Sequence, residues 1–426
     1  MNICMMTNTY APHIGGVARS IQSFAEQYEK KGHNVLIVAP TFPQDKDHTN
    51  KVIRIPALQN FNGSDFSVRI AVPGYIAEAI KDFNPDIIHS HHPFLMGDTA
   101  VRTARQYQLP LVFTHHTLYE QYTHYTPFNT PGFKELAKKL ATSYANLCSL
   151  VIAPSTSLAQ IIRERGVKTP IEVVPTGVNQ SFFQSGDGFR ARQKWGIPQN
   201  SFVVGHVGRL APEKNLHFLS VAVREAIKQR PDIYFMVVGE GSCQEEMSDI
   251  LLADNISDNV IFTGSLSGVE LADAYKAMDI FAFASQSETQ GMVIAEAMAA
   301  GLPVLALDAP GVRDVVQTGR NGIMLPEDTD TEKFADHVQK LSETENFQEY
   351  CACALETASQ LSHERCVNKM LDLYEELIET KSQAAGNSKK EYWARILNAF
   401  QAEWELFTEK ASSVFQLDNS SAKKRS

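Results

Sequence analysis

Short runs of apolar residues recur along the chain, and each is followed by a longer stretch with apolar residues at every third or fourth position. Runs of four to eight residues that are apolar on both faces are typical of buried parallel strands. The longer, amphipathic stretches predict helices. This alternation predicts an α/β fold with right-handed crossovers. The predicted strands are Ile3–Thr7, Val35–Pro40, Val52–Pro56, Asp86–Ser90, Leu111–His115, Leu150–Pro154, Ile171–Pro175, Phe202–Val207, Tyr234–Gly239, Val260–Gly264, Ile280–Ser285, Pro303–Leu307 and Gly322–Pro326, and the helices include Val17–Lys31, Phe133–Leu147, Leu216–Arg230 and Thr331–Leu341.

The series of strands starts again near residue 200, which predicts two doubly wound, Rossmann-like domains. Residues 1–180 form the first and residues 201–361 the second, and residues 181–200, without a clear strand, are expected to connect them. Ligands bind such sheets at the carboxyl ends of the strands, so we expect two facing domains with a cleft between them. Residues 362–381 predict a helix returning to the first domain, and residues 382–426 a helical tail.

Charge and hydropathy narrow the class of protein. The net charge of −10 argues against nucleic acid as a partner. Residues 1–185 carry 16 Lys and Arg against 13 Asp and Glu, a net charge of +3. This charge would favour binding to an anionic surface, but chance composition explains it equally well. Neither a secretory signal nor a run of about 18 apolar residues is visible, so we expect a cytoplasmic protein, peripheral at most on the inner face of the plasma membrane.

Two segments have a pattern that suits a membrane surface. In the predicted helix Gly132–Cys148, Lys134 and Lys138 share one face beside apolar residues, as in helices that lie in an anionic interface. An ordinary packed surface helix has the same pattern. The tail carries a stripe of aromatic residues. This stripe could contact lipid, pack on the protein body or pair with a second copy of the chain. The stripe consists of Tyr392, Trp393, Ile396, Leu397, Phe400, Trp404 and Phe407.

Charged side chains lie directly after strands of the second domain. Arg209 and Lys214 follow its first strand, and a planar guanidinium beside an ammonium suits a diphosphate, although two solvated surface charges would look the same. Glu288 lies in a loop after a later strand, and Glu296 lies in a helix predicted to begin near Gly291. Glu296 is flanked by small apolar residues, so we expect a buried carboxylate that sugar hydroxyls could satisfy.

Three features could hold an anion or a metal. The amides of Gly291, Met292 and Val293 form a predicted helix start, which favours negative charge. Gly15 and Gly16 follow the first strand and open a helix, the pattern of a phosphate turn or of a plain tight turn. Strand ends of the first domain also carry histidines in adjacent pairs, but neighbours in a strand point to opposite faces, so we expect no metal. These histidines are His91, His92, His115 and His116.

Together these segments resemble the retaining family-4 glycosyltransferases with the GT-B fold, over nearly all of residues 1–380. The narrower resemblance is to bacterial diacylglycerol glucosyltransferases, through the segments His115–Tyr125 and Glu288–Gly291. Other members of the family act on soluble sugars or transfer mannose to phosphatidylinositol. The residues that carry the family resemblance are Gly15-Gly16-Val17, His116-Thr117, Pro175-Thr176-Gly177-Val178-Asn179, Gly208-Arg209 with Glu213-Lys214, and Glu288 with Glu296.

The resemblance implies roles for the site residues. Arg209 and Lys214 are similar to the clamp on the donor diphosphate, and Glu296 to the residue that binds the nucleotide ribose. Glu288 is similar to the contact with the donor sugar hydroxyls, aided by the Gly291–Val293 amides. The second domain is then the donor-nucleotide domain and the first the acceptor domain.

In the first domain, His116 resembles the histidine near the donor sugar, and Gly15 and Gly16 the turn against the phosphates. Gln290 stands where many relatives carry an aromatic residue or Gly, which leaves the transferred sugar open. The resemblance implies UDP-glucose as co-substrate, a membrane lipid such as diacylglycerol as acceptor, and neither cofactor nor metal. The implied catalytic residues are His116, Glu288, Arg209 and Lys214.

Other functions share parts of this pattern. Two glutamates also suit a glycoside hydrolase, but they stand beside a predicted phosphate clamp that a hydrolase does not need. A mannosyl- or other hexosyltransferase would act on phosphatidylinositol or a soluble sugar. A non-catalytic sugar-nucleotide-binding protein would keep the clamp without the reaction.

Overall fold

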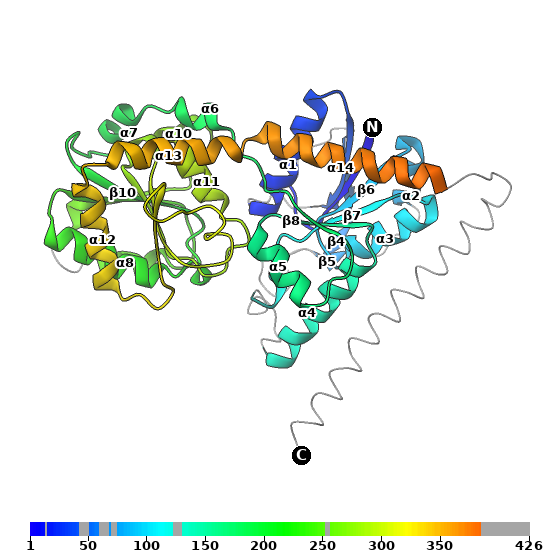
Figure 1. Cartoon of the computed structure of the whole chain (residues 1–426), viewed down its shortest axis with the longest axis horizontal. Coiled ribbons are helices and arrows are strands. Elements are labelled where there is room, and N and C mark those ends of the chain that lie inside the picture. Colours follow the sequence, from blue (N-terminus) through cyan, green and yellow to red (C-terminus); the bar gives the residue numbers. More distant parts are fainter. Residues whose placement is uncertain are drawn as a thin grey trace, which may run out of the picture. The chain divides into compact units, whose positions relative to one another are not determined.

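The computed structural model describes residues 1–12, 15–41, 51–58, 68–69, 75–121, 130–251 and 256–384. The chain forms two compact units (Figure 1). The first unit contains Met1–Thr176 and the chain from Cys366 onward, and the second is the continuous stretch Gly177–Arg365.

The first unit is built on a seven-stranded sheet in the order β3-β2-β1-β6-β7-β8-β9. All its strand pairs are parallel, and all seven predicted strands are confirmed, with ends that shift by one or two residues. A short antiparallel pair, β4 (Ala57–Leu58) with β5 (Val68–Arg69), was not predicted because two-residue strands show no periodicity. The sheet strands are β1 (Asn2–Met6), β2 (Asn34–Pro40), β3 (Val52–Ile55), β6 (Ile87–Ser90), β7 (Leu111–Thr114), β8 (Leu150–Ala153) and β9 (Ile171–Val173).

Helices cover both faces of this sheet, because alternate residues of each strand point to opposite sides. In β1, Cys4 and Met6 join one hydrophobic cluster, while Ile3 and Met5 join the other. The first cluster is covered by α2 (Tyr75–Phe83), α3 (Met96–Tyr107), α4 (Pro131–Asn146) and α5 (Thr156–Glu164), and the second by α1 (Gly16–Lys30) and α14 (His363–Ala384).

The second unit is built on a six-stranded parallel sheet in the order β12-β11-β10-β13-β14-β15. All six predicted strands are confirmed as β10 (Phe202–Val207), β11 (Ile233–Val238), β12 (Val260–Gly264), β13 (Ile280–Phe283), β14 (Val304–Leu307) and β15 (Gly322–Leu325). One face packs on α8 (Leu216–Gln229), α9 (Gln244–Leu251) and α12 (Thr331–Glu343). The other packs on α6 (Gln180–Gln184), α7 (Gly188–Lys194), α10 (Gly268–Ala277), α11 (Met292–Ala299) and α13 (Phe347–Gln360).

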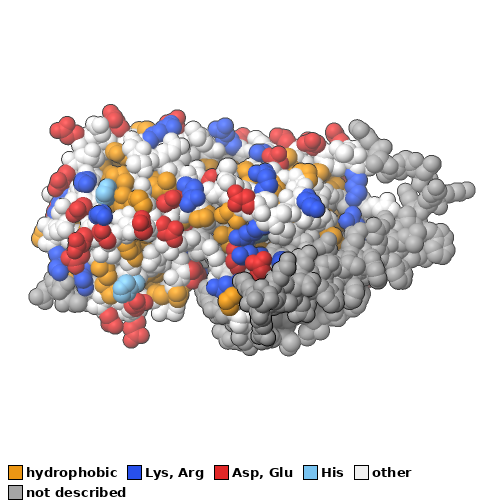
Figure 2. All heavy atoms as spheres, turned by 60° about the horizontal axis from the view of Figure 1, so that its bottom comes forward, with side chains coloured by type: hydrophobic (Ala, Val, Ile, Leu, Met, Phe, Trp, Pro, Cys, Tyr) orange, Lys and Arg blue, Asp and Glu red, His pale blue; other side chains and the backbone are white. Residues whose placement is uncertain are grey.

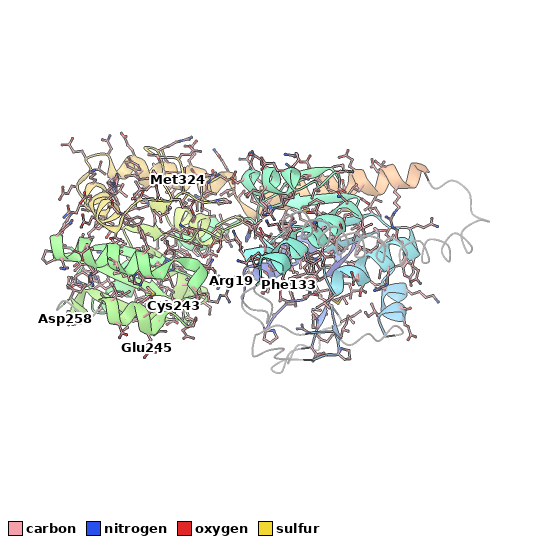
Figure 3. All side chains as sticks on the ribbon, turned by 90° about the horizontal axis from the view of Figure 1, so that it is seen from below. Arg19, Phe133, Cys243, Glu245, Asp258 and Met324 are labelled. Atoms are coloured by element: carbon pink, nitrogen blue, oxygen red, sulfur yellow. The ribbon has the colours of Figure 1, made fainter. Side chains whose placement is uncertain are left out.

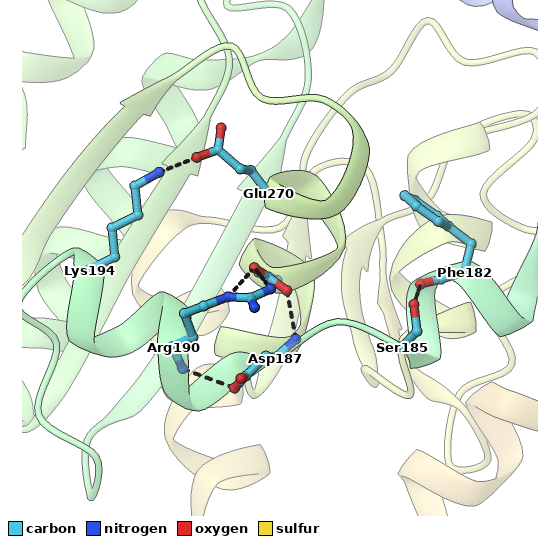
Figure 4. A network of polar contacts seen from close by, with 7 residues as sticks. Phe182, Ser185, Asp187, Arg190, Lys194 and Glu270 are labelled. Carbon is cyan, nitrogen blue, oxygen red and sulfur yellow. Dashed lines mark hydrogen bonds and ion pairs between the residues drawn. The ribbon is translucent and has the colours of Figure 1, made fainter.

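Residues 181–200 differ from the connection that we expected, because they form α6 and α7 and belong to the second unit. Arg190 Nε donates to Asp273 Oδ2 at 2.9 Å, within the network of polar contacts in Figure 4. Arg192 Nη2 donates to Asp279 Oδ2 at 2.8 Å. Helices of five and seven residues are too short to show a hydrophobic period, so the polar composition of the segment masked them.

The last described helix, α14, packs with the first unit from Cys366 onward. Tyr374 is fully buried, and the Tyr28 hydroxyl of α1 donates to its hydroxyl at 3.4 Å. Lys369 Nζ lies 3.1 Å from Glu172 Oε2. The predicted tail lies outside the described residues from position 385.

Candidate functional site

The Arg209 turn follows β10 and is held by the loop after β11. Leu210 N–H donates to Glu240 O at 2.9 Å, and Cys243 N–H (Figure 3) donates to Leu210 O at 3.0 Å. A Cβ on Gly239 would lie 1.9 Å from Gly208 O, so the approach requires glycine. Sequence analysis missed this supporting loop, although a glycine pair directly after a buried strand was a usable signal.

Lys214 and Glu288 come together at the carboxyl ends of neighbouring strands β10 and β13. Lys214 Nζ donates to Glu288 Oε1, and the two side chains are 19% and 15% exposed. The hydroxyls of Ser285 and Ser287 each donate to Glu213 O at 3.3 Å. The two motifs, distant in the sequence, therefore form one hydrogen-bonded site.

Arg209 also has an acidic partner within its own turn. Its Nη2 donates to Glu213 Oε1, four residues further on. The Arg209 side chain is 53% exposed, whereas the Glu213 side chain is only 7% exposed. A buried acid therefore anchors one side of a guanidinium that stays accessible to an anion.

Gly291 directly precedes α11, near the predicted start of the helix, and has a φ of +70°, in the left-handed region that favours glycine. A Cβ on Gly311 would lie 2.8 Å from Gln290 N, so a second turn packs closely behind this loop. Met292 and Val293 are the first residues of the helix, whose unpaired amides favour an anion.

Glu296 lies in α11 and is partly exposed, which corrects our expectation of a buried carboxylate. Its Oε2 accepts a hydrogen bond of 2.8 Å from the Tyr275 hydroxyl of α10. The protein itself thus supplies one donor. Sequence analysis missed Tyr275, because an aromatic residue on an apolar helix face looks like core.

His206 is a second residue that sequence analysis missed. It is fully buried in β10, and its ring is stacked against Phe281 and Phe283. Its Nδ1–H donates to Ala282 O at 3.2 Å, and within the described residues Nε2 has no hydrogen-bond partner. Burial lowers the pKa of His206 to about 4, so its ring is neutral near pH 7.

In the first unit, Gly15 is the extended residue before α1 and Gly16 is its first residue. A Cβ on Gly16 would meet no described atom within 4 Å. Packing of the described residues therefore gives no reason for glycine at this position. Residues 13–14 of the same motif lie outside the described residues.

The four histidines at strand ends separate into different surroundings. His91 Nδ1 lies 3.0 Å from His116 Nε2, so this pair is joined. His92 Nδ1 instead accepts from Asn8 N–H at 3.1 Å, and His115 packs on Tyr119. Among the residues that the structure describes, no group of three or more His, Cys, Asp or Glu could hold a metal ion.

Two family models together match most of the chain. The model for "Glycosyltransferase Family 4" matches residues 14–182, and the model for "Glycosyl transferases group 1" matches residues 188–355. The boundary between the two matched segments lies close to the boundary of the two units.

Named relatives and a solved structure also match the chain. An alpha-monoglucosyldiacylglycerol synthase of Streptococcus pneumoniae is 32% identical over 74% of this chain and 73% of its own. A GDP-mannose-dependent alpha-mannosyltransferase of Corynebacterium glutamicum is 26% identical over 89% of each chain. The structure of Anabaena HepE in complex with UDP superposes with a TM-score of 0.72, at 21% identity, over 88% of this chain and 100% of that one. This last likeness shows that the fold is that of the GT-B glycosyltransferases.

Proposed function

The chain belongs to the family-4 glycosyltransferases, and on that premise we propose that it transfers glucose from UDP-glucose to a membrane lipid such as diacylglycerol. The pairing of Lys214 with Glu288, beside the Arg209 turn, carries the proposal. It offers a cation to a diphosphate and a carboxylate to sugar hydroxyls within one hydrogen-bonded unit.

The described contacts support a division of labour at the donor. Lys214 and Glu288 form an ion pair. A diphosphate would draw the ammonium of Lys214, which releases the Glu288 carboxylate to accept from sugar hydroxyls. Glu296, oriented by Tyr275, would accept from the ribose.

Bond breaking leaves an oxocarbenium-like sugar and builds negative charge on the departing phosphate. Arg209, Lys214 and the start of α11 would stabilise that charge as it develops, which is the largest expected catalytic contribution. Once the diphosphate has drawn Lys214 from Glu288, the cations and the helix amides need little further reorganisation during bond breaking. His116, in the first unit, would act near the donor sugar.

The name of the pneumococcal relative supports the lipid acceptor and the stereochemistry. It specifies an alpha-glucoside of diacylglycerol, and the glucose of UDP-glucose is itself alpha-linked, so the same outcome here is retention. The C. glutamicum relative favours GDP-mannose as the second candidate donor. Both donors therefore belong in the test.

A membrane acceptor requires contact with a lipid surface, which we propose is peripheral. No helix among the described residues is long and apolar enough to cross a bilayer. On the face drawn in Figure 2, acidic and basic side chains are interspersed rather than gathered by sign. Helix α4, with Phe133 in its first turn (Figure 3), presents exposed Lys134, while Lys138 pairs with Glu135 at 3.4 Å. On this face, attraction to anionic lipid would therefore be local.

The test incubates the full chain with radiolabelled UDP-glucose or GDP-mannose and diacylglycerol in mixed micelles, with and without phosphatidylglycerol. We expect labelled glycolipid from UDP-glucose and a higher rate with the anionic lipid. Glu288→Gln removes the charge but keeps the shape of the side chain. It should lower the rate on the order of 10²-fold, because the donor sugar loses its positioning contact.

Glu345→Gln, at an exposed position after α12, makes the same chemical change away from the site and should leave the rate unchanged. Label transferred only from GDP-mannose would replace the donor assignment. If neither donor gives a lipid product while soluble sugars accept the label, the acceptor assignment is wrong.

A further inference from the structure

His91 and His116 meet because their strands are neighbours. β6 and β7 pair in parallel, and the two histidines follow their carboxyl ends. His91 Nδ1 lies 3.0 Å from His116 Nε2, and the two ring planes are inclined by 26° with centroids 5.3 Å apart. The two rings therefore meet edge to edge, along the line of the hydrogen bond.

The ring of His91 is held on its other side as well. The ring of His89 lies 4.2 Å away between centroids. His89 is fixed in turn by hydrogen bonds to the Tyr374 hydroxyl of α14 and, at 2.7 Å, to the Thr114 hydroxyl of β7. A ring between two others, 1% exposed, has little freedom to rotate.

Both rings of the pair are neutral. Burial, reinforced by the neighbouring histidines, holds the pKa of His91 and of His116 well below the ordinary value. Each neutral ring carries one N–H, so a single hydrogen lies between Nδ1 of His91 and Nε2 of His116. Which ring supplies that hydrogen decides the chemistry of His116.

The buried Nε2 of His91 decides between the two arrangements, because within the described residues it has no hydrogen-bond partner. If His116 were the donor, His91 would carry its hydrogen on Nε2 and bury an unpaired N–H. If His91 is the donor, Nε2 carries only a lone pair. Buried N–H groups without an acceptor are rarer in proteins than buried acceptors without a donor.

We propose that His91 is a positioning residue that donates Nδ1–H to His116 Nε2 and so fixes His116 in the tautomer protonated at Nδ1. His116 then meets its substrate as a neutral hydrogen-bond donor and not as a general base. This inference rests on the proposed function for the role of His116, whereas the tautomer itself does not depend on it. The same arrangement occurs where a partner fixes the tautomer of a metal-bound histidine.

The test is ¹⁵N NMR of the full chain labelled at histidine, with the His116 signals assigned by their loss in His116→Asn. We expect a protonated Nδ1 and a bare Nε2. His91→Asn can donate from nearly the position of Nδ1 and should preserve that pattern. His91→Phe keeps an aromatic ring in the stack but has no donor, and should shift the hydrogen to Nε2 or mix the tautomers.

Kinetics with the donor that proves active supply the second readout. His91→Phe should lower kcat roughly 10–100-fold, the range for partners that fix histidine tautomers. The KM for the donor should stay unchanged, and His91→Asn should restore most of the rate. A His116 protonated at Nε2 in the wild type, or an unaltered tautomer in His91→Phe, overturns the proposal. If the tautomers behave as expected but no sugar is transferred, the proposed function fails and the assignment to His91 stands.

Discussion

At the residue scale, three acids of the proposed donor site each have a partner from the protein. Glu288 accepts from Lys214, Glu213 from Arg209, and Glu296 from Tyr275. Two of these partners are cations that an anionic ligand would attract. Tyr275 is neutral and buried, so its hydrogen bond should persist when a nucleotide binds.

Tyr275→Phe tests whether that hydroxyl orients Glu296. A hydrogen bond to a charged group contributes about 1.5–3 kcal/mol net, so we expect the Kd for UDP to rise by about 10-fold or more. Isothermal titration calorimetry measures the change directly. Tyr350→Phe is the matched control, because the Tyr350 side chain packs against the cluster on the other face of the sheet. An unchanged Kd for Tyr275→Phe, together with weaker binding by Glu296→Gln, would show that Glu296 needs no such orientation.

At the scale of the element, the start of α11 depends on one left-handed residue. Gly291 has a φ of +70°, and a Cβ there would lie 3.0 Å from Ile294 Cδ1. The turn at Gly311 packs behind the same loop. The helix amides therefore have little room to move without losing their direction.

Gly291→Ala should lower the free energy of unfolding by about 1–2 kcal/mol, the cost of a left-handed backbone with a side chain. It should also weaken UDP binding, because the crowded Cβ displaces the first turn of α11. Gly319→Ala is the matched control: its φ is +81°, and a Cβ there meets no described atom within 4 Å. Urea unfolding should show a similar loss of stability for both variants, and calorimetry weaker UDP binding for Gly291→Ala alone. Equal UDP binding by both would remove the start of α11 from the donor site.

At the scale of the whole molecule, buried neutral histidines make stability sensitive to acid. Burial lowers the pKa of His89 and His115 to about 3 and that of His206 to about 4, and it lowers those of His91 and His116 as well. In the unfolded chain these groups titrate near 6.5. Between 6.5 and the folded values, the unfolded state binds more protons, so stability falls as the pH falls.

We therefore expect the free energy of unfolding to decrease below pH 6.5 by about 1.4 kcal/mol per pH unit for each such histidine. Urea unfolding at pH 7.5, 6.5 and 5.5, followed by circular dichroism, measures the slope. His115→Phe keeps an aromatic ring beside Phe113 and Tyr119. It should reduce the slope of stability against pH by the contribution of one histidine. His337→Gln, on the solvent side of α12, should leave the slope unchanged. Equal slopes in His115→Phe and the wild type would contradict the lowered pKa of His115.

Much of the fold could be predicted from the sequence, because a strand buried on both faces must be apolar throughout. The run Phe202–Val207 shows this and has the observed bounds. Helices α6 and α7 were not predicted, because they are too short to show the periodic pattern of apolar residues that indicates a helix. Their attachment depends on Arg190 and Arg192, which donate to Asp273 and Asp279, more than 80 residues further along the chain.

The candidate site was predictable where charged residues follow the ends of apolar strands. Arg209, Lys214 and Glu288 stand directly after strand ends, and the structure brings their loops together. His206 and Tyr275 lie inside apolar segments. In such segments the sequence does not distinguish a residue of the site from a residue of the core. The pairing of Lys214 with Glu288 depends on the order of the strands in the sheet. The periodicity of apolar residues does not predict this order.

The order in which the two units can be completed during synthesis follows from the course of α14. The second unit is one continuous stretch, Gly177–Arg365, whereas the first unit takes its last helix from the chain beyond it. Val367, Met370 and Tyr374 fill one face of the first sheet and leave the ribosome after the second unit has emerged. Domains usually fold from the N-terminus as they are made. Here the later unit is the first whose core can be completed, and the earlier one lacks α14 until then, so part of an apolar face beside α1 stays uncovered.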